Sequence, residues 1–366
     1  MSVTMKEIAR IAGVSRQAVA AALSDVGTSK VSPATRERVK SIARSLHYIP
    51  NLSARSLKGA ASMTIGIYGV PYASVLSQCF FNELSVFLDR KGYNLMACYG
   101  MNEEASEQAV RRLMAKGIDG MIVTTQDNPL VKWDLPATPN VFAPPGRIDG
   151  FDVVVDHAAG TAKAVSEMLK RGRKRFVYVT TTLNDFYARP NQEKYRGFSE
   201  ALADAGMSAA LLTIEECGGR GDKLLEQLKK LAPDTIFCSN DYFAGRLISL
   251  LLSDGVKIPD DVMMIGYDGL AMCDLCAVSL TTIVQPVRQM AEKVVDLLLE
   301  RIEAKTANCP PAGIELEPYF YPSASIGVMN EKMRSLPIYN SYSSLEANWY
   351  DAIYNINSLA GEESKS

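Results

Sequence analysis

The sequence predicts an α/β protein, in which an N-terminal three-helix, helix-turn-helix domain precedes a two-lobed core of doubly wound parallel sheets. Short capped helices, joined by a glycine-containing turn, occupy the first fifty residues. From residue 62 onward, strand-like and helix-like segments alternate. The sign of the net charge also changes near residue 60, and this change separates the two parts.

The first helices are marked by their capping residues. Thr4 and the glutamate three positions later have the spacing of a capping box. Gly13 is expected to end this helix, and Ser15 to be the N-cap of a second one. A third helix begins with Ser32 as N-cap and Pro33 at its first position. Two short helices on either side of a glycine-containing turn are typical of the helix-turn-helix, a DNA-binding motif.

The basic residues of the chain are concentrated at its N-terminus. Residues 1–60 hold ten Lys and Arg and three Asp and Glu, an excess of seven positive charges. The remaining residues hold 29 Lys and Arg and 38 Asp and Glu, an excess of nine negative charges. This distribution, in a chain of net charge −2, is typical of a nucleic-acid-binding head on a soluble body. The alternative is an ordinary solvated basic helix bundle, which the paired caps and the turn disfavour.

Beyond residue 60 the pattern is that of layered sheets and helices. Apolar and β-branched runs predict strands at 62–68, 93–99, 120–124, 153–155, 176–179, 211–212, 235–238 and 263–266. Helical spacing of apolar residues predicts helices at 84–92, 103–116, 162–170, 193–205, 222–231, 242–252 and 287–304. Alternation of this kind predicts parallel sheets with helices on both faces, where ligands bind beyond the carboxyl ends of the strands.

Composition excludes several other classes of protein. A chain of 366 residues with 47% apolar residues is long enough to bury more than one core. The N-terminus lacks the apolar segment of a signal peptide, and no run approaches the length of a membrane span. Seven scattered cysteines, an odd number, are typical of free thiols. We therefore expect a cytoplasmic protein without a membrane segment.

Five short motifs follow one another in the first sixty residues: MKEIA at 5–9, AGVS at 12–15, VSPATR at 31–36, YIPN at 48–51 and ARSL at 54–57. With these motifs the chain resembles the LacI/GalR family of bacterial transcriptional regulators. The resemblance implies a homodimeric repressor, whose second helices enter adjacent major grooves of a near-palindromic, double-stranded operator DNA. It also implies that residues 49–60 form a hinge helix, which folds on DNA and inserts Leu57 into the minor groove.

The resemblance also indicates which residues contact DNA. Arg16 and Gln17 hold the base-contacting start of the second helix, where arginine suits guanine and glutamine suits adenine. Alanines at positions 20–22 replace the polar residues usual on the later turn. The full set of expected contacts is Thr4, Ser15, Arg16, Gln17, Ala18, Ser32, Thr35, Arg36, Asn51, Ala54, Arg55, Leu57 and Lys58.

Further motifs extend the resemblance over residues 62–328, among them GIDG at 117–120, SND at 239–241 and GYD at 266–268. They imply a periplasmic-binding-protein-like core of two α/β lobes, joined by three crossovers. The expected parts are a helix-turn-helix domain (1–48), a hinge helix (49–60), an effector-binding and dimerisation core (61–329) and a C-terminal extension (330–366). Within the core, the N-terminal lobe is expected at 61–156 and 287–317, and the C-terminal lobe at 157–286 and 318–329. The aromatic-rich extension is expected to dock on the body or on a neighbouring subunit.

A small-molecule effector between the lobes is a further implication, and a sugar is the most common effector in the family. Asn240 and Asp268 follow strands and match positions that hydrogen-bond the effector. Lys194 stands where an arginine usually grips it, and a lysine offers a point charge instead of a planar fork. Asp241 is either a further ligand group or the N-terminal carboxylate of its own helix. The aromatic candidates for packing against a sugar, each of which also fits a core position, are Tyr72, Phe80 and Phe81.

Signs of catalysis or of a metal site are weak. Cys273 and Cys276 form a single C-x-x-C pair with no second pair or histidine at metal spacing, which favours two free thiols. His157 lies beside Asp156 without a nucleophile pattern, and no phosphate-binding or dinucleotide-binding glycine motif follows a strand. We therefore expect a regulator that is not an enzyme and that needs no cofactor or metal. A solute-binding protein with the same core is the alternative, and it leaves the basic head unexplained.

Overall fold

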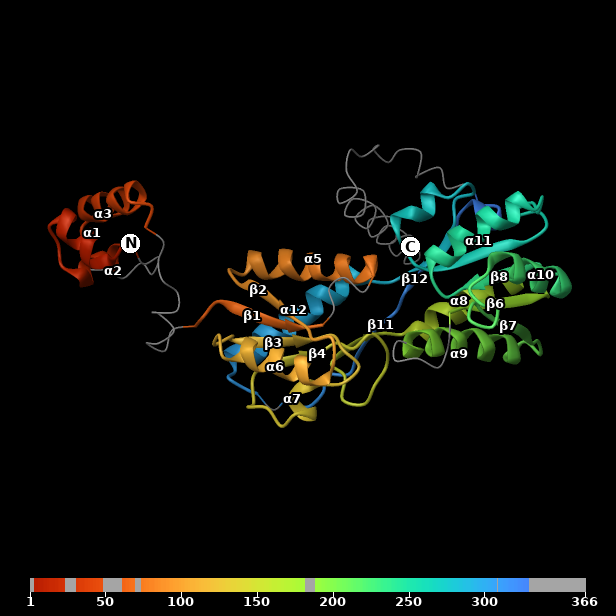
Figure 1. Ribbon diagram of the computed structural model, residues 1–366, viewed down its shortest axis with the longest axis horizontal. Coiled ribbons are helices and arrows are strands. Elements are labelled where there is room, and N and C mark those ends of the chain that lie inside the picture. The colour runs from red at the N-terminus through yellow and green to blue at the C-terminus, as the bar shows by residue number, and fades with distance from the viewer. Residues whose placement is uncertain are drawn as a thin grey trace, which may run out of the picture. The chain divides into compact units, whose positions relative to one another are not determined.

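The structure, a computed structural model, describes residues 3–23, 31–48, 61–69, 74–181, 188–307 and 309–328. The contacts within the chain divide it into two units, Met1–Ser62 and Met63–Ser366 (Figure 1). The expected hinge helix and the C-terminal extension lie outside the described residues. The same is true of six expected site residues, Asn51, Ala54, Arg55, Leu57, Lys58 and Tyr72.

The first unit is a three-helix bundle. Its helices are α1 (Met5–Ala12), α2 (Arg16–Leu23) and α3 (Pro33–Ser45). Ile8, Val19 and Val39, one from each helix, are fully buried in the shared core. Gly13 ends α1 with a φ of +61°, a left-handed conformation that glycine adopts without a steric penalty. The predicted capped helices and their turn are therefore confirmed.

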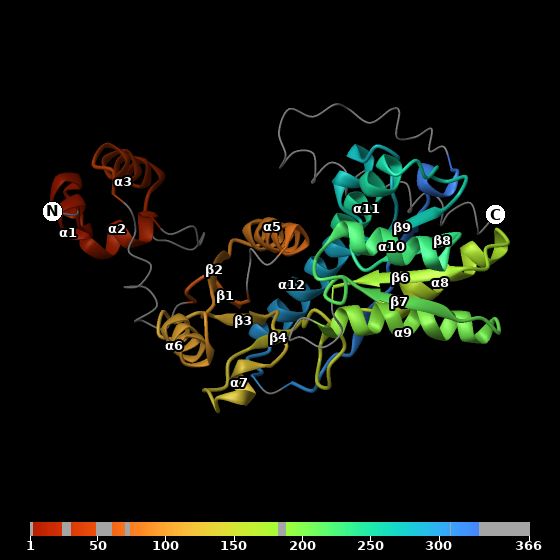
Figure 2. The same ribbon diagram turned by 45° about the vertical axis from the view of Figure 1, so that its right-hand side comes forward.

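We call the part of the second unit that is built on a four-stranded parallel sheet the N-terminal lobe. The sheet has the order β2-β1-β3-β4, with strands β1 (Thr64–Tyr68), β2 (Asn94–Cys98), β3 (Gly120–Val123) and β4 (Asn140–Phe142). Its helices are α5 (Val75–Arg90), α6 (Glu103–Met114), α7 (Pro129–Lys132) and α12 (Val287–Glu303). Helices α5 and α12 pack together on one face of the sheet, and α6 covers the other (Figure 2).

The C-terminal lobe is built on a six-stranded sheet of order β12-β10-β9-β8-β6-β7. Its strands are β6 (Phe176–Thr180), β7 (Ala209–Thr213), β8 (Thr235–Cys238), β9 (Met263–Asp268), β10 (Thr281–Val284) and β12 (Tyr319–Tyr321), of which β12 alone is antiparallel to its neighbour. Its helices are α8 (His157–Lys170), α9 (Ala188–Asp204), α10 (Gly221–Leu231) and α11 (Asp241–Ser253), with short 3-10 turns at η1 (Ala271–Leu275) and η2 (Ala324–Ile326).

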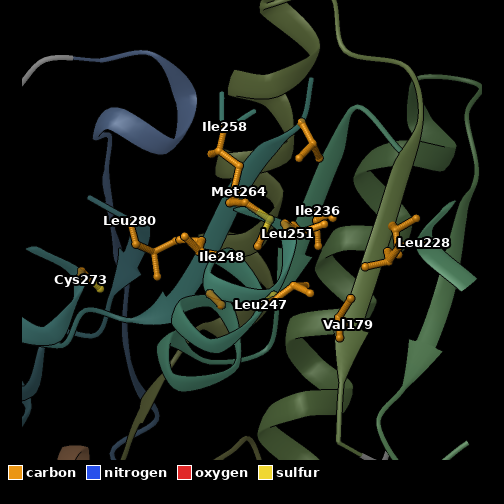
Figure 3. Close-up of a cluster of buried hydrophobic side chains, with 14 of the residues drawn as sticks. Val179, Leu228, Ile236, Leu247, Ile248, Leu251, Ile258, Met264, Cys273 and Leu280 are labelled. Carbon is orange, nitrogen blue, oxygen red and sulfur yellow. The ribbon is translucent and has the colours of Figure 1, made fainter. Parts of the chain in front are cut away.

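Two apolar layers hold the C-terminal lobe together. Helices α10 and α11 cover one face of the sheet, where Leu228, Leu247 and Met264 belong to the cluster of buried side chains shown in Figure 3. Helices α8 and α9 cover the other face, with Phe198 fully buried. The two helices approach closely at Gly197, because a Cβ there would lie 2.2 Å from the carbonyl oxygen of Ala158. This packing confirms the predicted arrangement of helices on both faces of a parallel sheet.

The chain passes between the lobes three times. Strand β5 (Val153–Val155) pairs with β11 (Ile314–Leu316) beside the N-terminal lobe, and α8 of the C-terminal lobe begins directly after β5. The second passage joins β10 to α12, and the third joins β11 to β12. No helix within the described ranges is long and apolar enough to cross a lipid bilayer.

Some elements differ from the sequence-based expectation. Helix α9 begins at Ala188, five residues before the expected start, because Pro190 falls in the first turn, where no intrahelical bond needs its missing amide hydrogen. Strands β4, β10, β11 and β12, each of three or four residues, and the short α7 were not expected. Such short strands are fixed by pairing with distant segments, which leaves little local signal in the sequence.

Candidate functional site

The N-terminal end of α2 is open to solvent. Ser15 caps the helix, and its Oγ accepts a 3.1 Å hydrogen bond from the amide of Ala18. Ser15, Arg16 and Gln17 are exposed, whereas Val19 on the next turn is fully buried. Among the described residues, no hydrogen bond or ion pair holds the Arg16 or Gln17 side chain, so both are available to a partner.

The other two helices of the head begin in a similar way. Thr4 Oγ1 accepts from the amide of Glu7 at 3.3 Å, and Ser32 Oγ accepts from the amide of Thr35, also at 3.3 Å. The expected contacts in the described part of the head therefore lie near the starts of three helices, where backbone N–H groups favour phosphate. Of these contacts, Thr4 and Ser32 are exposed, and Ala18, Thr35 and Arg36 are half-buried.

A cavity of about 560 Å³ lies between the two lobes of the second unit. The N-terminal lobe contributes α5 and the loop after β3, and the C-terminal lobe contributes α9 and the ends of β8 and β9. The five expected effector contacts within the described residues all line this cavity: Phe80, Phe81, Lys194, Asn240 and Asp268. Apolar side chains that include Leu76, Val287 and Met290 complete the wall. A large, partly apolar cavity with a few convergent polar groups is typical of a small-molecule site.

Lys194 and Asp268 form an ion pair in the wall of the cavity. The Nζ atom of Lys194 lies 3.3 Å from Asp268 Oδ1 and donates to the carbonyl oxygen of Ser239 at 2.9 Å. It also lies 4.0 Å from the centroid of the Tyr267 ring. An ammonium group has three hydrogens, and these three contacts occupy them. Lys194 is 4% exposed and therefore holds Asp268 in place instead of presenting a free charge to the cavity.

The carboxyl group of Asp268 keeps one oxygen available. Oδ1 accepts from Lys194 and, at 2.8 Å, from Gln285 Nε2, whereas Oδ2 has no donor among the described residues. Burial raises the pKa of Asp268, and Lys194 and Gln285 oppose that rise. The backbone φ of +116° is rare for a residue other than glycine and costs about 1–3 kcal/mol. Strain of this size at the end of a strand is characteristic of functional positions.

Beyond the cation–π contact of Lys194 with Tyr267, two hydrogen bonds lead from Tyr267 through His157 to the opposite lobe. His157 Nδ1 lies 2.9 Å from the hydroxyl of Tyr267, and Nε2 lies 3.0 Å from the carbonyl oxygen of Pro145, which follows β4. A carbonyl oxygen only accepts, so Nε2 carries the proton and Nδ1 accepts from Tyr267. Burial and then the charge of Lys194 lower the pKa of His157 to about 3, so the imidazole is neutral.

Asp241 is the first residue of α11, as one of the two readings made from the sequence expected, and it is not among the described residues that line the cavity. It is fully buried, and Oδ2 accepts from the amides of Gly269 and Leu270, each at 2.8 Å. Oδ1 accepts from Thr282 Oγ1 at 2.6 Å. The carboxylate, in the first turn of α11, therefore also fixes the loop after β9. The N-cap of α11 is Asn240, whose Oδ1 accepts from the amide of Phe243 at 2.9 Å.

Sequence reasoning missed several polar residues of the cavity, among them Gln126, His157 and Gln285. Gln126 and Gln285 each follow the carboxyl end of a strand, β3 and β10, and this position was the available signal. His157 was set aside because no nucleophile pattern accompanies it. Its partner Tyr267 is 110 residues away in the sequence, and Pro145 contributes only its backbone oxygen, so neither contact could be predicted. Within the described ranges, no cluster of three or more metal-binding side chains is found, and the seven cysteines are free thiols.

Comparison with known proteins agrees with this architecture. Residues 4–51 match the bacterial regulatory proteins of the lacI family, and residues 165–320 match a periplasmic binding protein-like domain. The HTH-type transcriptional repressor PurR of Vibrio parahaemolyticus serotype O3:K6 is 30% identical over 318 residues, which cover 82% of this chain and 92% of that repressor.

Two solved structures share the fold. The crystal structure of the Lac repressor dimer bound to operator and the anti-inducer ONPF has a TM-score of 0.77 and 22% identity, and covers 89% of this chain and 99% of that one. The transcriptional regulator CelR–cellobiose complex has a TM-score of 0.61 and 23% identity, and the match covers 88% of this chain and 99% of that one.

A helix-turn-helix head on a two-lobed, periplasmic-binding-protein-like core defines the class of DNA-binding transcriptional regulators. Within that class, the chain belongs to the lacI family of bacterial regulatory proteins.

Proposed function

We propose that this protein is a cytoplasmic, homodimeric repressor, whose affinity for a near-palindromic operator is changed by a sugar bound between the lobes. The observation that carries the proposal is the presence, on one chain, of an open helix-turn-helix and of a cavity lined by both lobes of the core. A ligand that touches both lobes binds more tightly to one degree of lobe closure than to another. Through this difference in affinity the ligand shifts the protein toward one closure, and DNA binding changes with it.

The DNA part of the proposal rests on α2. Arg16 reads guanine with a bidentate contact, and Gln17 reads adenine in the same way, because both side chains are exposed at the start of the helix. Ser15, Ser32 and the amides beside them bind phosphates and set the position of the head. The hinge helix and the minor-groove wedge at Leu57 belong to the proposal and lie outside the described residues.

The sugar part rests on the lining of the cavity. Phe80 and Phe81 offer aromatic faces for the C–H face of a sugar, and Asp268 Oδ2 offers an acceptor for a hydroxyl group. Lys194 acts as a positioning residue for that acceptor. The CelR regulator, which shares the fold, was solved with cellobiose.

The homodimer is supported by exposed apolar side chains on the N-terminal lobe. Met96 and Tyr99 are 40% and 45% exposed at the edge of its sheet, and Met101, just beyond them, is 89% exposed. Large apolar groups gathered at one edge are typical of an interface. The Lac repressor, a structural neighbour, was solved as a dimer.

Selection of a binding site from random DNA, followed by a titration of sugars, tests the proposal. The full chain should enrich a near-palindrome with half-sites about one helical turn apart, and one sugar should change its affinity. Failure to enrich any sequence, together with tight sugar binding, would favour a solute-binding protein instead. A solute-binding protein would account for the two-lobed core and would leave the exposed face of α2 without a function.

A further inference from the structure

Gln126 is a buried side-chain amide without a hydrogen-bond partner among the residues that the structure describes. It is 5% exposed, and neither Nε2 nor Oε1 forms a hydrogen bond with any residue that the structure describes. Buried amides are normally hydrogen-bonded, because they lose water on burial and need a replacement. Gln126 lines the cavity between the lobes and also an adjoining, more open cavity of about 620 Å³. The unsatisfied amide is therefore part of the lining of both cavities.

The charges around this amide are already compensated. Of the described residues lining the cavity between the lobes, only Lys194 and Asp268 are charged, and they pair with each other. His157 is neutral, because its Nδ1 accepts a hydrogen bond while its Nε2 donates one. A ligand with a net charge would leave water without gaining a counter-charge, which is unfavourable in such a site.

The adjoining cavity is lined by more charged side chains than the cavity between the lobes. Two of its arginines pair with carboxylates of the protein, Arg147 with Asp156 and Glu315, and Arg196 with Glu200. A third lining arginine, Arg189, is exposed to solvent. An anionic ligand of the two paired arginines would have to displace those carboxylates. The electrostatics of the cavity between the lobes therefore favour an uncharged ligand there.

We propose that Gln126 is a specificity-determining residue, which reads an uncharged group that carries a donor and an acceptor side by side. A primary amide offers one donor edge and one acceptor edge, so its complement is a vicinal diol of a sugar or the lactam edge of a nucleobase. The inference rests on the proposed function, because it assigns the effector to the cavity between the lobes. It adds that the effector is neutral and that the N-terminal lobe contributes to its recognition through Gln126.

The first test needs no ligand and compares two glutamines of one cavity. Gln126→Leu removes an amide that lacks a partner and should leave the melting temperature of the full chain unchanged or raise it, because an apolar group of similar size loses no bond. Gln285→Leu removes the donor to Asp268 and should lower the melting temperature. If both variants are destabilised alike, Gln126 has a structural partner and the inference is overturned.

The second test uses matched neutral and charged probes on the full chain. D-Glucose, D-ribose and uracil are the neutral probes, and D-glucuronate, D-glucosamine, D-glucose 6-phosphate and orotate are charged counterparts. Titration calorimetry should detect a neutral probe only. Gln126→Leu should weaken that probe roughly ten- to a hundredfold, because one donor and one acceptor of the ligand lose their partner.

The outcomes separate this inference from the proposed function. Uracil binding that depends on Gln126 supports the inference and contradicts the part of the proposed function that names a sugar as the effector. Sugar binding that is unchanged in Gln126→Leu overturns the inference and leaves the proposed function standing. Preference for a charged probe over its neutral counterpart overturns the neutrality argument. If no probe binds the parent, the sugar assignment loses its support, and the melting temperatures of the two leucine variants decide the role of Gln126.

Discussion

The hydroxyl of Tyr267 lies 2.9 Å from Nδ1 of His157, a hydrogen bond that joins the end of β9 to the start of α8. On its other side, His157 donates to Pro145 of the N-terminal lobe, and the Tyr267 ring carries the ammonium of Lys194 on its face. The Asp268 carboxylate, which lines the cavity, is thus linked through three side chains to a contact between the lobes. A ligand that changes the position of Asp268 acts on this linkage directly.

The first prediction concerns the pH dependence of stability. The pKa of His157 is lowered from 6.5 to about 3, first by burial and then by Lys194. Below pH 6.5 the unfolded chain takes up a proton that the folded chain refuses, so stability falls toward pH 3. The free energy of unfolding should fall by about 1.4 kcal/mol per pH unit in this range. Above pH 6.5 the contribution of His157 to stability does not change with pH.

The variant His157→Gln isolates this term. Burial raises the pKa of Asp241 and Asp268, and these two groups therefore make the folded protein more stable toward acid, opposite to the effect of His157. Both carboxyl groups are retained in the variant, so their effect is present in both proteins. Urea unfolding between pH 4 and pH 7 should show a shallower loss of stability toward acid in His157→Gln than in the parent. Identical slopes would mean that His157 is protonated in the folded protein.

A second prediction concerns the buried ion pair. Lys194→Met leaves Asp268 without its counter-charge, and breaking a buried pair on one side costs about 3–5 kcal/mol. We expect the lower end of this range, because the side chain of Asp268 is 16% exposed. The control is Lys170→Met, since Lys170 is 71% exposed beside Glu167 and its loss should cost no more than about 1 kcal/mol. Equal free energies of unfolding for the two variants would contradict a buried pair.

Backbone strain at Asp268 gives a third prediction. Both Asp268→Ala and Asp268→Gly lose the ion pair, but only glycine relieves the φ of +116°. The glycine variant should therefore be the more stable by about 1 kcal/mol, the reverse of the usual order. Thermal unfolding of the two variants decides this, and a more stable alanine variant would show that the backbone relaxes at no cost.

The fourth prediction concerns base readout by α2. Arg16→Ala should lose roughly 1–3 kcal/mol of operator binding and relax the preference at one guanine in each half-site. Arg38, exposed on α3, serves as the control, and Arg38→Ala should keep the same base preference. Binding-site selection with both variants is the measurement. Equal relaxation in the two variants would remove Arg16 from the base-reading position.

The features predicted from the sequence are those with a local signal. Thr4, Ser15 and Ser32 cap helices as their spacing indicates, and the alternation of strands and helices gives the two-lobed α/β architecture. Asp268 was expected in the cavity because it ends a strand. Contacts that depend on distant segments could not be predicted. Asp241, for example, bonds to loop amides that lie 28 and 29 residues further along the chain.

The most direct test of the account measures operator affinity with and without the effector in Asp268→Asn. This variant keeps the shape of the side chain and loses the charge that pairs with Lys194. The parent should change its affinity for the selected operator, by fluorescence anisotropy, when the sugar with the highest affinity is added. Asp268→Asn should bind the operator as the parent does and show no response to the sugar. A full response in Asp268→Asn would contradict control of DNA binding from the cavity between the lobes.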